Sequence, residues 1–159
     1  MSDTHLQRVT ETLSDIGQPP PSRRALSARR NHITQKVKIA GQRTLYISVH
    51  DDEHPAEIFL RLKGRDCSSE LIGLYDVIAR LASIALQHGA PLAKVGDLLT
   101  GAKFEPAGPV SGHDRIRYCT SLPDLIGRHL LIEYCGREDL AHQTTEDAPA
   151  SARSEGVHT

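Results

Sequence analysis

The chain has 159 residues, of which 38% are hydrophobic and 25% are charged, and its formal net charge is −1. This composition is typical of one modest globular domain with polar ends. It excludes a polycation that binds nucleic acid through bulk charge, and no apolar run approaches the roughly 20 residues that span a bilayer. The N-terminus lacks the apolar core of a secretory signal, so we expect a cytoplasmic protein that is not bound to a membrane.

Both ends of the chain are predicted to be disordered. Residues 1–22 end in a Pro-Pro-Pro-Ser run, which favours an extended conformation. Residues 143–159 contain a single Val and no larger apolar side chain, which is too little to offset the entropy of ordering. The folded domain is therefore expected to span residues 23–142.

The first half of this domain is predicted to be β-structure. Apolar and polar side chains alternate over residues 34–40, 44–50 and 57–63, which gives each strand one apolar and one wet face. Gly41 can take the positive φ of a tight hairpin turn, and the polar run 51–55 supplies the second turn. The prediction is an antiparallel three-stranded meander whose apolar face needs cover.

About three helices are predicted to cover that face. Apolar residues recur at intervals of three and four over residues 69–88, 91–100 and 122–135. A glycine follows each segment, as is common at helix ends. Ser121 and Asp124 resemble a capping box for the third helix. Strands followed by helices predict an α+β fold of two layers.

The segment 103–117, between the second and third helices, is predicted to be a long functional loop. Its two prolines and two glycines argue against a helix or a central strand, and loops of this length are usually functional or disordered. The candidate binding residues are Glu105, Gly108, Gly112, His113, Asp114 and Arg115. In the alternative interpretation, Asp114 and Arg115 pair with each other or with a helix end, and the glycines only form turns. A loop histidine such as His113 is expected to be solvated.

No catalytic residue and no metal site are predicted. Cys67, Cys119 and Cys135 lack metal-finger spacing, and the nine histidines are scattered, so we expect buried or half-buried thiols. Phosphate-binding loops, HExxH and nucleophile elbows are absent from the sequence. A weaker hypothesis makes the chain an enzyme that acts through Cys119, Glu105 and Asp114.

A basic block lies between residues 23 and 38, and its members are Arg23, Arg24, Arg29, Arg30, Lys36 and Lys38. The block lacks the interleaved aromatic residues on which single-strand binders stack bases. Its two lysines fall on the wet face of the first strand, where lysine also discourages edge-to-edge pairing. We therefore expect a solvated face that docks a partner, with nucleic acid an unlikely ligand.

Several blocks of the sequence resemble the C-terminal TSCPD-type domain of adenosylcobalamin-dependent (class II) ribonucleotide reductases. They include Thr34-Gln35-Lys36, Glu57-Ile58-Phe59, Gly89 to Leu92, Phe104-Glu105-Pro106, Gly112 to Ile116, Gly136-Arg137 and Asp139 to His142. The resemblance covers about residues 23–142, the whole predicted domain. It departs from the family motif at Leu122, where the name-giving cysteine would stand.

The resemblance implies an association with the reduction of ribonucleotides to deoxyribonucleotides for DNA synthesis. In the family, that chemistry belongs to a large barrel with a radical cysteine, a reducing cysteine pair and adenosylcobalamin, and none of this barrel is present here. Residues 143–159 contain no cysteine that could shuttle electrons. We therefore expect this chain to bind no cofactor, and adenosylcobalamin enters by family association only.

Two functions stay open at this point. In the first, the chain is a stand-alone, non-catalytic accessory protein that binds a separate ribonucleotide reductase catalytic subunit or a nucleotide. In the second, it is a detached domain reused as a nucleotide- or protein-binding regulatory module unrelated to reduction. Whether the chain is itself an enzyme is left open, although it is expected to be inactive alone.

Overall fold

The computed structural model describes residues 21–142. Residues 1–20 and 143–159 are not described, so the predicted disorder of the two ends lies almost wholly outside the described residues. Within residues 21–142, no helix is both long enough and apolar enough to cross a membrane.

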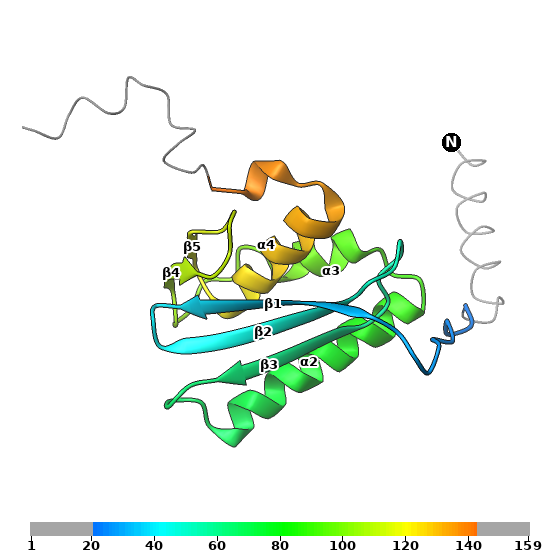
Figure 1. Cartoon of the computed structure of the whole chain (residues 1–159), viewed down its shortest axis with the longest axis horizontal. Coiled ribbons are helices and arrows are strands. Elements are labelled where there is room, and N and C mark those ends of the chain that lie inside the picture. The colour runs from blue at the N-terminus through cyan, green and yellow to red at the C-terminus, as the bar shows by residue number, and fades with distance from the viewer. Residues whose placement is uncertain (1–20, 143–159) are drawn as a thin grey trace, which may run out of the picture.

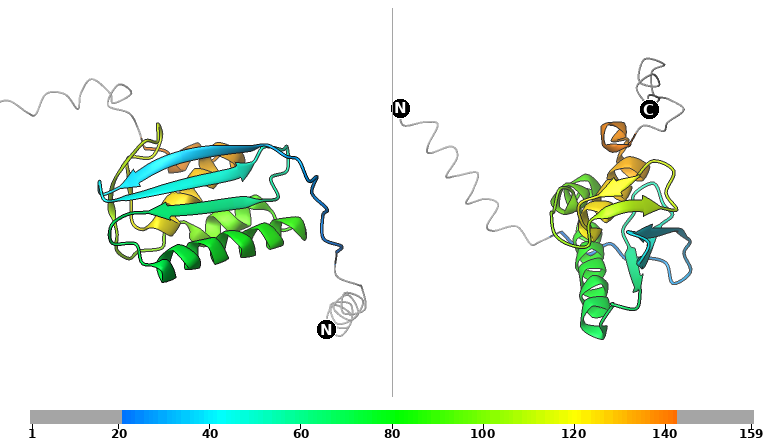
Figure 2. Two further views of the ribbon diagram at one scale, coloured as in Figure 1. Left: turned by 60° about the horizontal axis from the view of Figure 1, so that its bottom comes forward. Right: turned by 90° about the vertical axis from the view of Figure 1, so that its left-hand side faces the viewer.

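The described residues form two layers, a sheet on one side and helices on the other (Figure 1 and Figure 2). The α+β prediction is therefore confirmed. The elements in chain order are β1 (His32–Ile39), β2 (Arg43–His50), β3 (Ile58–Lys63), α2 (Ser69–Gln87), α3 (Leu92–Leu99), β4 (Gly108–Ser111), β5 (Tyr118–Cys119), α4 (Leu122–Cys135) and the short 3-10 helix η1 (Glu138–Leu140).

The predicted meander is present as β1, β2 and β3, paired antiparallel. His32 lies opposite His50 at one end of the first hairpin and Ile39 opposite Arg43 at the other. Most apolar residues of these strands face the helices and are buried; they are Val37, Ile39, Leu45, Ile47, Val49, Ile58, Leu60 and Leu62. The side chains that alternate with them face solvent, so one face of the sheet is open.

The sheet has five strands in the order β3-β2-β1-β4-β5, not the three that the sequence predicts. Both additional strands include residues of the segment expected to be a loop or lie just after it. Pro109 is tolerated in β4 because the sheet uses its carbonyl oxygen and the N–H of the next residue. The Pro109 carbonyl oxygen accepts the Ala40 N–H at 2.8 Å, and the Val110 N–H donates to the Arg117 carbonyl. None of these bonds requires the N–H that proline lacks.

The three α-helices of residues 21–142 form the second layer, over the apolar face of the sheet. α2 packs along the edge strand β3, where the buried Ser83 hydroxyl accepts the Ile58 N–H at 2.9 Å and so satisfies an edge donor. α3 crosses α4 closely at two glycines, and a Cβ on Gly127 would lie 2.7 Å from the Gly96 carbonyl oxygen. α4 is the most deeply buried helix, with nine of its residues buried.

The segment that precedes β1 is tied to the domain by part of the basic block. The Arg24 N–H donates to the Gln87 carbonyl at the end of α2, and its guanidinium pairs with Asp52 at 3.1 Å. Arg30 forms a two-pronged ion pair with Glu57. These arginines serve internal contacts and are not available as a free basic surface.

Candidate functional site

The six candidate residues of segment 103–117 do not converge on one site. Glu105 and Asp114 are exposed. The Glu105 carboxylate accepts the N–H of Ala107, two residues further along the same loop. Among the described residues, Asp114 forms no ion pair with Arg115, the partner considered in the sequence interpretation.

The two candidate glycines lie against the sheet. Gly108 has φ +147° and begins β4, and a Cβ there would lie 3.4 Å from the Cβ of Ala40. Gly112 has φ +87°, and a Cβ there would lie 2.7 Å from the Lys36 carbonyl oxygen. The Gly112 carbonyl also accepts from the Gln35 amide. The close approach that these glycines allow is that of β1 and of Ala40, which follows it.

His113 is buried, which corrects the expectation of a solvated loop histidine. Its Nδ1 accepts the backbone N–H groups of Arg115 and Ile116 at 3.1 and 3.2 Å. Because Nδ1 accepts, the ring proton resides on Nε2. That nitrogen lies 3.1 Å from Nδ1 of His129 on α4 and donates to it. The turn closes on itself and turns the ring inward, which is why it is not solvated.

Arg115 holds the 113–116 turn from its solvent side through two ion pairs. Its guanidinium lies 2.8 Å from the Glu133 carboxylate and 2.7 Å from that of Glu138. Glu133 in turn lies 3.7 Å from Nε2 of His113. The structure therefore brings two candidate residues together with three that the sequence interpretation missed, and we call His113, Arg115, His129, Glu133 and Glu138 the histidine cluster.

Burial keeps both histidines of the cluster neutral. It lowers the pKa of His129 to about 3, and the neighbouring His113 and Arg115 act in the same direction. Burial also lowers the pKa of His113, although Glu133 opposes this change. The exposed fraction of His129 is 3% and that of His113 is 4%, so neither ring can reach a substrate in solution. The pair joins the 113–116 turn to α4 and is not placed for acid–base catalysis.

Three groups of the histidine cluster have the chemistry of metal ligands. One ligand atom from each of His113, His129 and Glu133 lies within 4.8 Å of the others. A metal needs an unprotonated ring nitrogen, yet Nε2 of His113 carries its proton because Nδ1 accepts two amides. Arg115 also holds the Glu133 carboxylate. The geometry is that of a hydrogen-bonded contact that holds the 113–116 turn against α4.

Residues 120–124 start α4 and tie it to the end of α3. The Ser121 hydroxyl accepts the Asp124 N–H at 3.0 Å, which confirms the predicted cap. The Asp124 carboxylate does not complete the capping box, because it accepts from the N–H groups of Gly101 and Thr120 instead. It is fully buried and pairs with Arg128 at 3.0 Å. Leu122 is fully buried as well.

Residues 18–134 match the family model of the TSCPD domain. The chain belongs to the TSCPD domain family. It is 35% identical over 136 residues to the vitamin B12-dependent ribonucleotide reductases of Bradyrhizobium diazoefficiens and Agrobacterium fabrum, matches that cover 85% of this chain. The corresponding reductase of Rhodopirellula baltica is 32% identical over 120 residues, or 75% of the chain.

The TSCPD domain protein spans only about a tenth of each relative, 11%, 10% and 11% respectively. No solved structure matches it.

The relatives are named as B12-dependent, but the described residues of this TSCPD domain do not fit a cobalamin. Adenosylcobalamin is much larger than the drug-sized ligands that occupy clefts of about 300–1,000 Å³. Three hollows among residues 21–142 have volumes of about 610, 410 and 400 Å³, and all are open surface depressions. These residues do not form a cradle for the corrin ring, and no chemical step is assigned to it.

The thiols of the TSCPD domain are not poised for nucleophilic chemistry. Cys119 is buried, and burial followed by the nearby Asp124 raises its pKa to about 11. Burial also raises the pKa of Cys67 and of Cys135. A thiol with a raised pKa stays protonated at neutral pH, whereas the thiolate is the nucleophile. The structure gives no support to the hypothesis of an enzyme acting through Cys119.

One missed feature of the histidine cluster had a signal in the sequence. His129 and Glu133 are four residues apart in a predicted helix, so they were bound to share a face. Their proximity to His113 had no such signal, because it depends on how the 113–116 turn packs against α4.

Proposed function

We propose that this TSCPD domain protein is a non-catalytic accessory protein of ribonucleotide reduction that binds a separate catalytic subunit in the cytoplasm. The association with reduction is supported by the names of its relatives. The accessory role is supported by the protonated thiols described above, which lack the properties of a reducing pair.

The observation that carries the proposal is an apolar stripe on α2. Its members are separated by three, four and three residues and have exposed fractions of 52%, 42%, 63% and 45%: Leu74, Val77, Leu81 and Ile84. This is the spacing of a helix face that packs against another element. Within residues 21–142 nothing covers it, and we call it the α2 stripe.

The occupant that we propose for the α2 stripe is the catalytic subunit. About nine-tenths of each relative lies outside the matched segment, so in those proteins a much larger polypeptide is attached to this domain. An exposed apolar helix face typically docks into a groove of a partner.

Glu105 and Asp114 are a proposed second contact with the same subunit. Both are exposed, as is Phe104, the residue before Glu105, at 55%. The other four candidate residues of the loop, which contact β1 or join the histidine cluster, would hold this contact in shape. Substituting Asp114→Ala tests it, since the removal of an exposed carboxylate should weaken binding and leave stability unchanged.

The decisive experiment is a binding assay with a reductase catalytic subunit from the same cell that lacks this domain. Leu81→Glu should weaken binding at least about 30-fold, because a buried anchor is worth roughly 2 kcal/mol or more. Leu98→Glu is the matched control: Leu98 is 84% exposed on α3, which packs against α4. The affinity of the Leu98→Glu variant for the catalytic subunit should be unchanged.

Two results would redirect the proposal. Equal binding by both variants would remove the α2 stripe from the interface. A different partner, bound through the stripe and unconnected with reduction, would instead support a detached regulatory module. The nucleotide that the family association suggests is tested on the same sample, by calorimetric titration with ribonucleoside di- and triphosphates.

A further inference from the structure

The open face of the sheet carries an ordered array of aromatic and cationic side chains. Strand register places them in rows that cross β1, β2 and β3. The first row is Thr34, Ser48 and Phe59, the second is Lys36, Tyr46 and Arg61, and the third is Lys38, Thr44 and Lys63. Rows that face the same side are about 7 Å apart, because every second residue of a strand points the same way.

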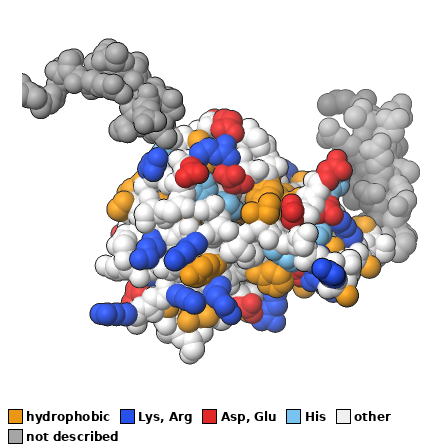
Figure 3. All heavy atoms as spheres, in the orientation of Figure 1, with side chains coloured by type: hydrophobic (Ala, Val, Ile, Leu, Met, Phe, Trp, Pro, Cys, Tyr) orange, Lys and Arg blue, Asp and Glu red, His pale blue; other side chains and the backbone are white. Residues whose placement is uncertain are grey.

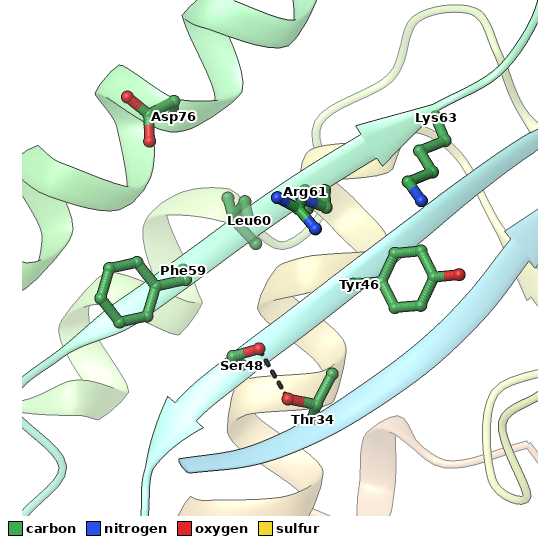
Figure 4. A pocket seen from close by; sticks show the side chains of 8 residues that line it. All are labelled: Thr34, Tyr46, Ser48, Phe59, Leu60, Arg61, Lys63 and Asp76. Carbon is green, nitrogen blue, oxygen red and sulfur yellow. Dashed lines mark hydrogen bonds between the residues drawn. The ribbon is translucent and has the colours of Figure 1, made fainter. Parts of the chain in front are cut away.

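The middle row puts an aromatic ring between two cations. Lys36 Nζ lies 5.9 Å from the centroid of the Tyr46 ring, and Lys63 Nζ from the next row lies 5.5 Å from it. Phe59 is 46% exposed, and the ring of His32 lies 5.2 Å from its own. Figure 4 shows Phe59, Arg61 and Lys63 along β3 with Tyr46 beside them on β2.

The charge of this face is not neutralised within the domain. Lys36, Lys38, Arg61 and Lys63 are exposed, and none forms an ion pair with another of residues 21–142. The nearest carboxylate that lines the hollow, Asp76 of α2, pairs with Arg80 at 3.0 Å. Figure 3 views the molecule from this side and shows Lys and Arg side chains gathered around hydrophobic ones over the strands.

We propose that the open face of β1–β3 binds single-stranded nucleic acid. Sheets that bind single strands offer aromatic side chains for the bases and cations for the backbone. Here Phe59 and Tyr46 provide the stacking surfaces, and the four cations face the phosphates. The basic block of residues 23–38 lacks aromatic residues in the sequence. Once the sheet forms, β2 and β3 place Tyr46 and Phe59 on the same face as its lysines.

The shape of the face favours a strand over a free nucleotide. The hollow lined by Thr34, Tyr46, Phe59, Arg61 and Lys63 has a volume of about 610 Å³ but is an open depression. Small-molecule sites usually enclose most of their ligand. On an open surface, affinity comes from several weak contacts repeated along a nucleic-acid strand. No member of the α2 stripe lines this hollow, so the inference does not depend on the proposed docking.

The test is fluorescence anisotropy of the full chain with a single-stranded probe of about 20 nucleotides, as DNA and as RNA, between about 50 and 200 mM salt. Arg61→Gln with Lys63→Gln should weaken binding and reduce the slope of log K against log salt by about 1.4, or 0.7 for each lost phosphate contact. Phe59→Ala should weaken binding roughly 5- to 150-fold with the slope unchanged.

The matched control is Lys94→Gln, which removes one exposed charge from α3 in the other layer. It should leave the affinity and the salt slope unchanged. Equal losses in Lys94→Gln and in the sheet variants, or no binding at the lowest salt, would overturn the proposal. Amide chemical shifts of the unmodified chain give a check that needs no variant, since changes should concentrate on β1–β3.

Competition separates the remaining ligands. A mononucleotide that displaces the probe as well as an unlabelled oligonucleotide does would replace the strand with a free nucleotide and overturn the proposal. Polyglutamate that competes equally would assign the face to acidic protein segments and would overturn it as well. Displacement by the oligonucleotide alone supports it.

Discussion

The buried carboxylate of Asp124 makes the sharpest residue-level prediction. Burial alone would raise the pKa of Asp124, but hydrogen bonds from Gly101, Thr120 and Arg128 outweigh it and keep the pKa below its usual value. Asp124→Asn turns an amide N–H₂ towards either the Gly101 or the Thr120 N–H, and it removes the carboxylate that pairs with Arg128. We expect a loss of roughly 3 kcal/mol in the free energy of unfolding, measured by urea titration.

Asp114→Asn is the control for that substitution. Asp114 is exposed, so the same chemical change should alter stability by no more than about 0.5 kcal/mol. Equal effects of the two substitutions would show that the Asp124 hydrogen bonds contribute little to the start of α4.

The histidine cluster predicts a loss of stability in mild acid. The pKa of His129 is about 3 in the folded domain, against about 6.5 in an unfolded chain. The unfolded state therefore binds a proton first as the pH falls below about 6.5, and stability decreases by about 1.4 kcal/mol per pH unit. His129→Gln keeps an acceptor for His113 but cannot titrate. Between about pH 7.5 and 5, its urea-derived stability should fall by about 2 kcal/mol less than that of the unmodified chain.

Single residues also show where sequence interpretation succeeds. The cap at Ser121 was predictable because capping is local, a hydroxyl and an N–H three residues apart. The burial of His113 and the double ion pair of Arg115 were not, because their partners lie 16 to 23 residues further along the chain.

At the scale of elements, the crossing of α3 and α4 depends on glycine. A Cβ on Gly127 would lie 2.7 Å from both the Gly96 carbonyl oxygen and the Thr100 nitrogen, and backbone atoms cannot move aside as a side chain can. We expect Gly127→Ala to cost about 2 kcal/mol or more in thermal or urea unfolding, despite the better helix propensity of alanine.

Gly73 in α2 gives the matched comparison, because a Cβ there would meet nothing within 4 Å. Gly73→Ala should stabilise the domain by about 0.5–1 kcal/mol. A stabilising Gly127→Ala would mean that the two helices separate at little cost.

The elements that the sequence predicted best are those with strong periodicity. Alternation over β1, β2 and β3, and the three- and four-residue spacing of α2 and α4, follow directly from burying one face. β4 and β5 were not predicted because they are short and show little alternation of apolar and polar residues. Gly108 and Pro109 argue against a strand, and the pairing of β4 with β1 involves only Lys38 and Ile39 of β1. Long-range pairing supplies what local propensity does not.

At the scale of the whole molecule, the purified protein is predicted to form no deoxyribonucleotide by itself. The described residues span one small domain, and the raised pKa values of its three thiols keep them protonated at neutral pH. The assay combines the protein with adenosylcobalamin, a dithiol and each ribonucleotide in turn. Product above a blank without protein would contradict the accessory role; added catalytic subunit is the positive control.

The path by which the chain enters the domain has a consequence for tethering. Nδ1 of His88 donates to the Pro21 carbonyl at 3.1 Å, and the Arg24 N–H bonds the Gln87 carbonyl, so the segment begins beside the end of α2. A polypeptide fused ahead of Pro21 would start next to the helix that carries the α2 stripe. With a short flexible tether, its effective concentration there is in the millimolar range. A fused catalytic chain could occupy the stripe with weak intrinsic affinity, whereas a separate subunit must evolve a tighter interface to reach the same occupancy.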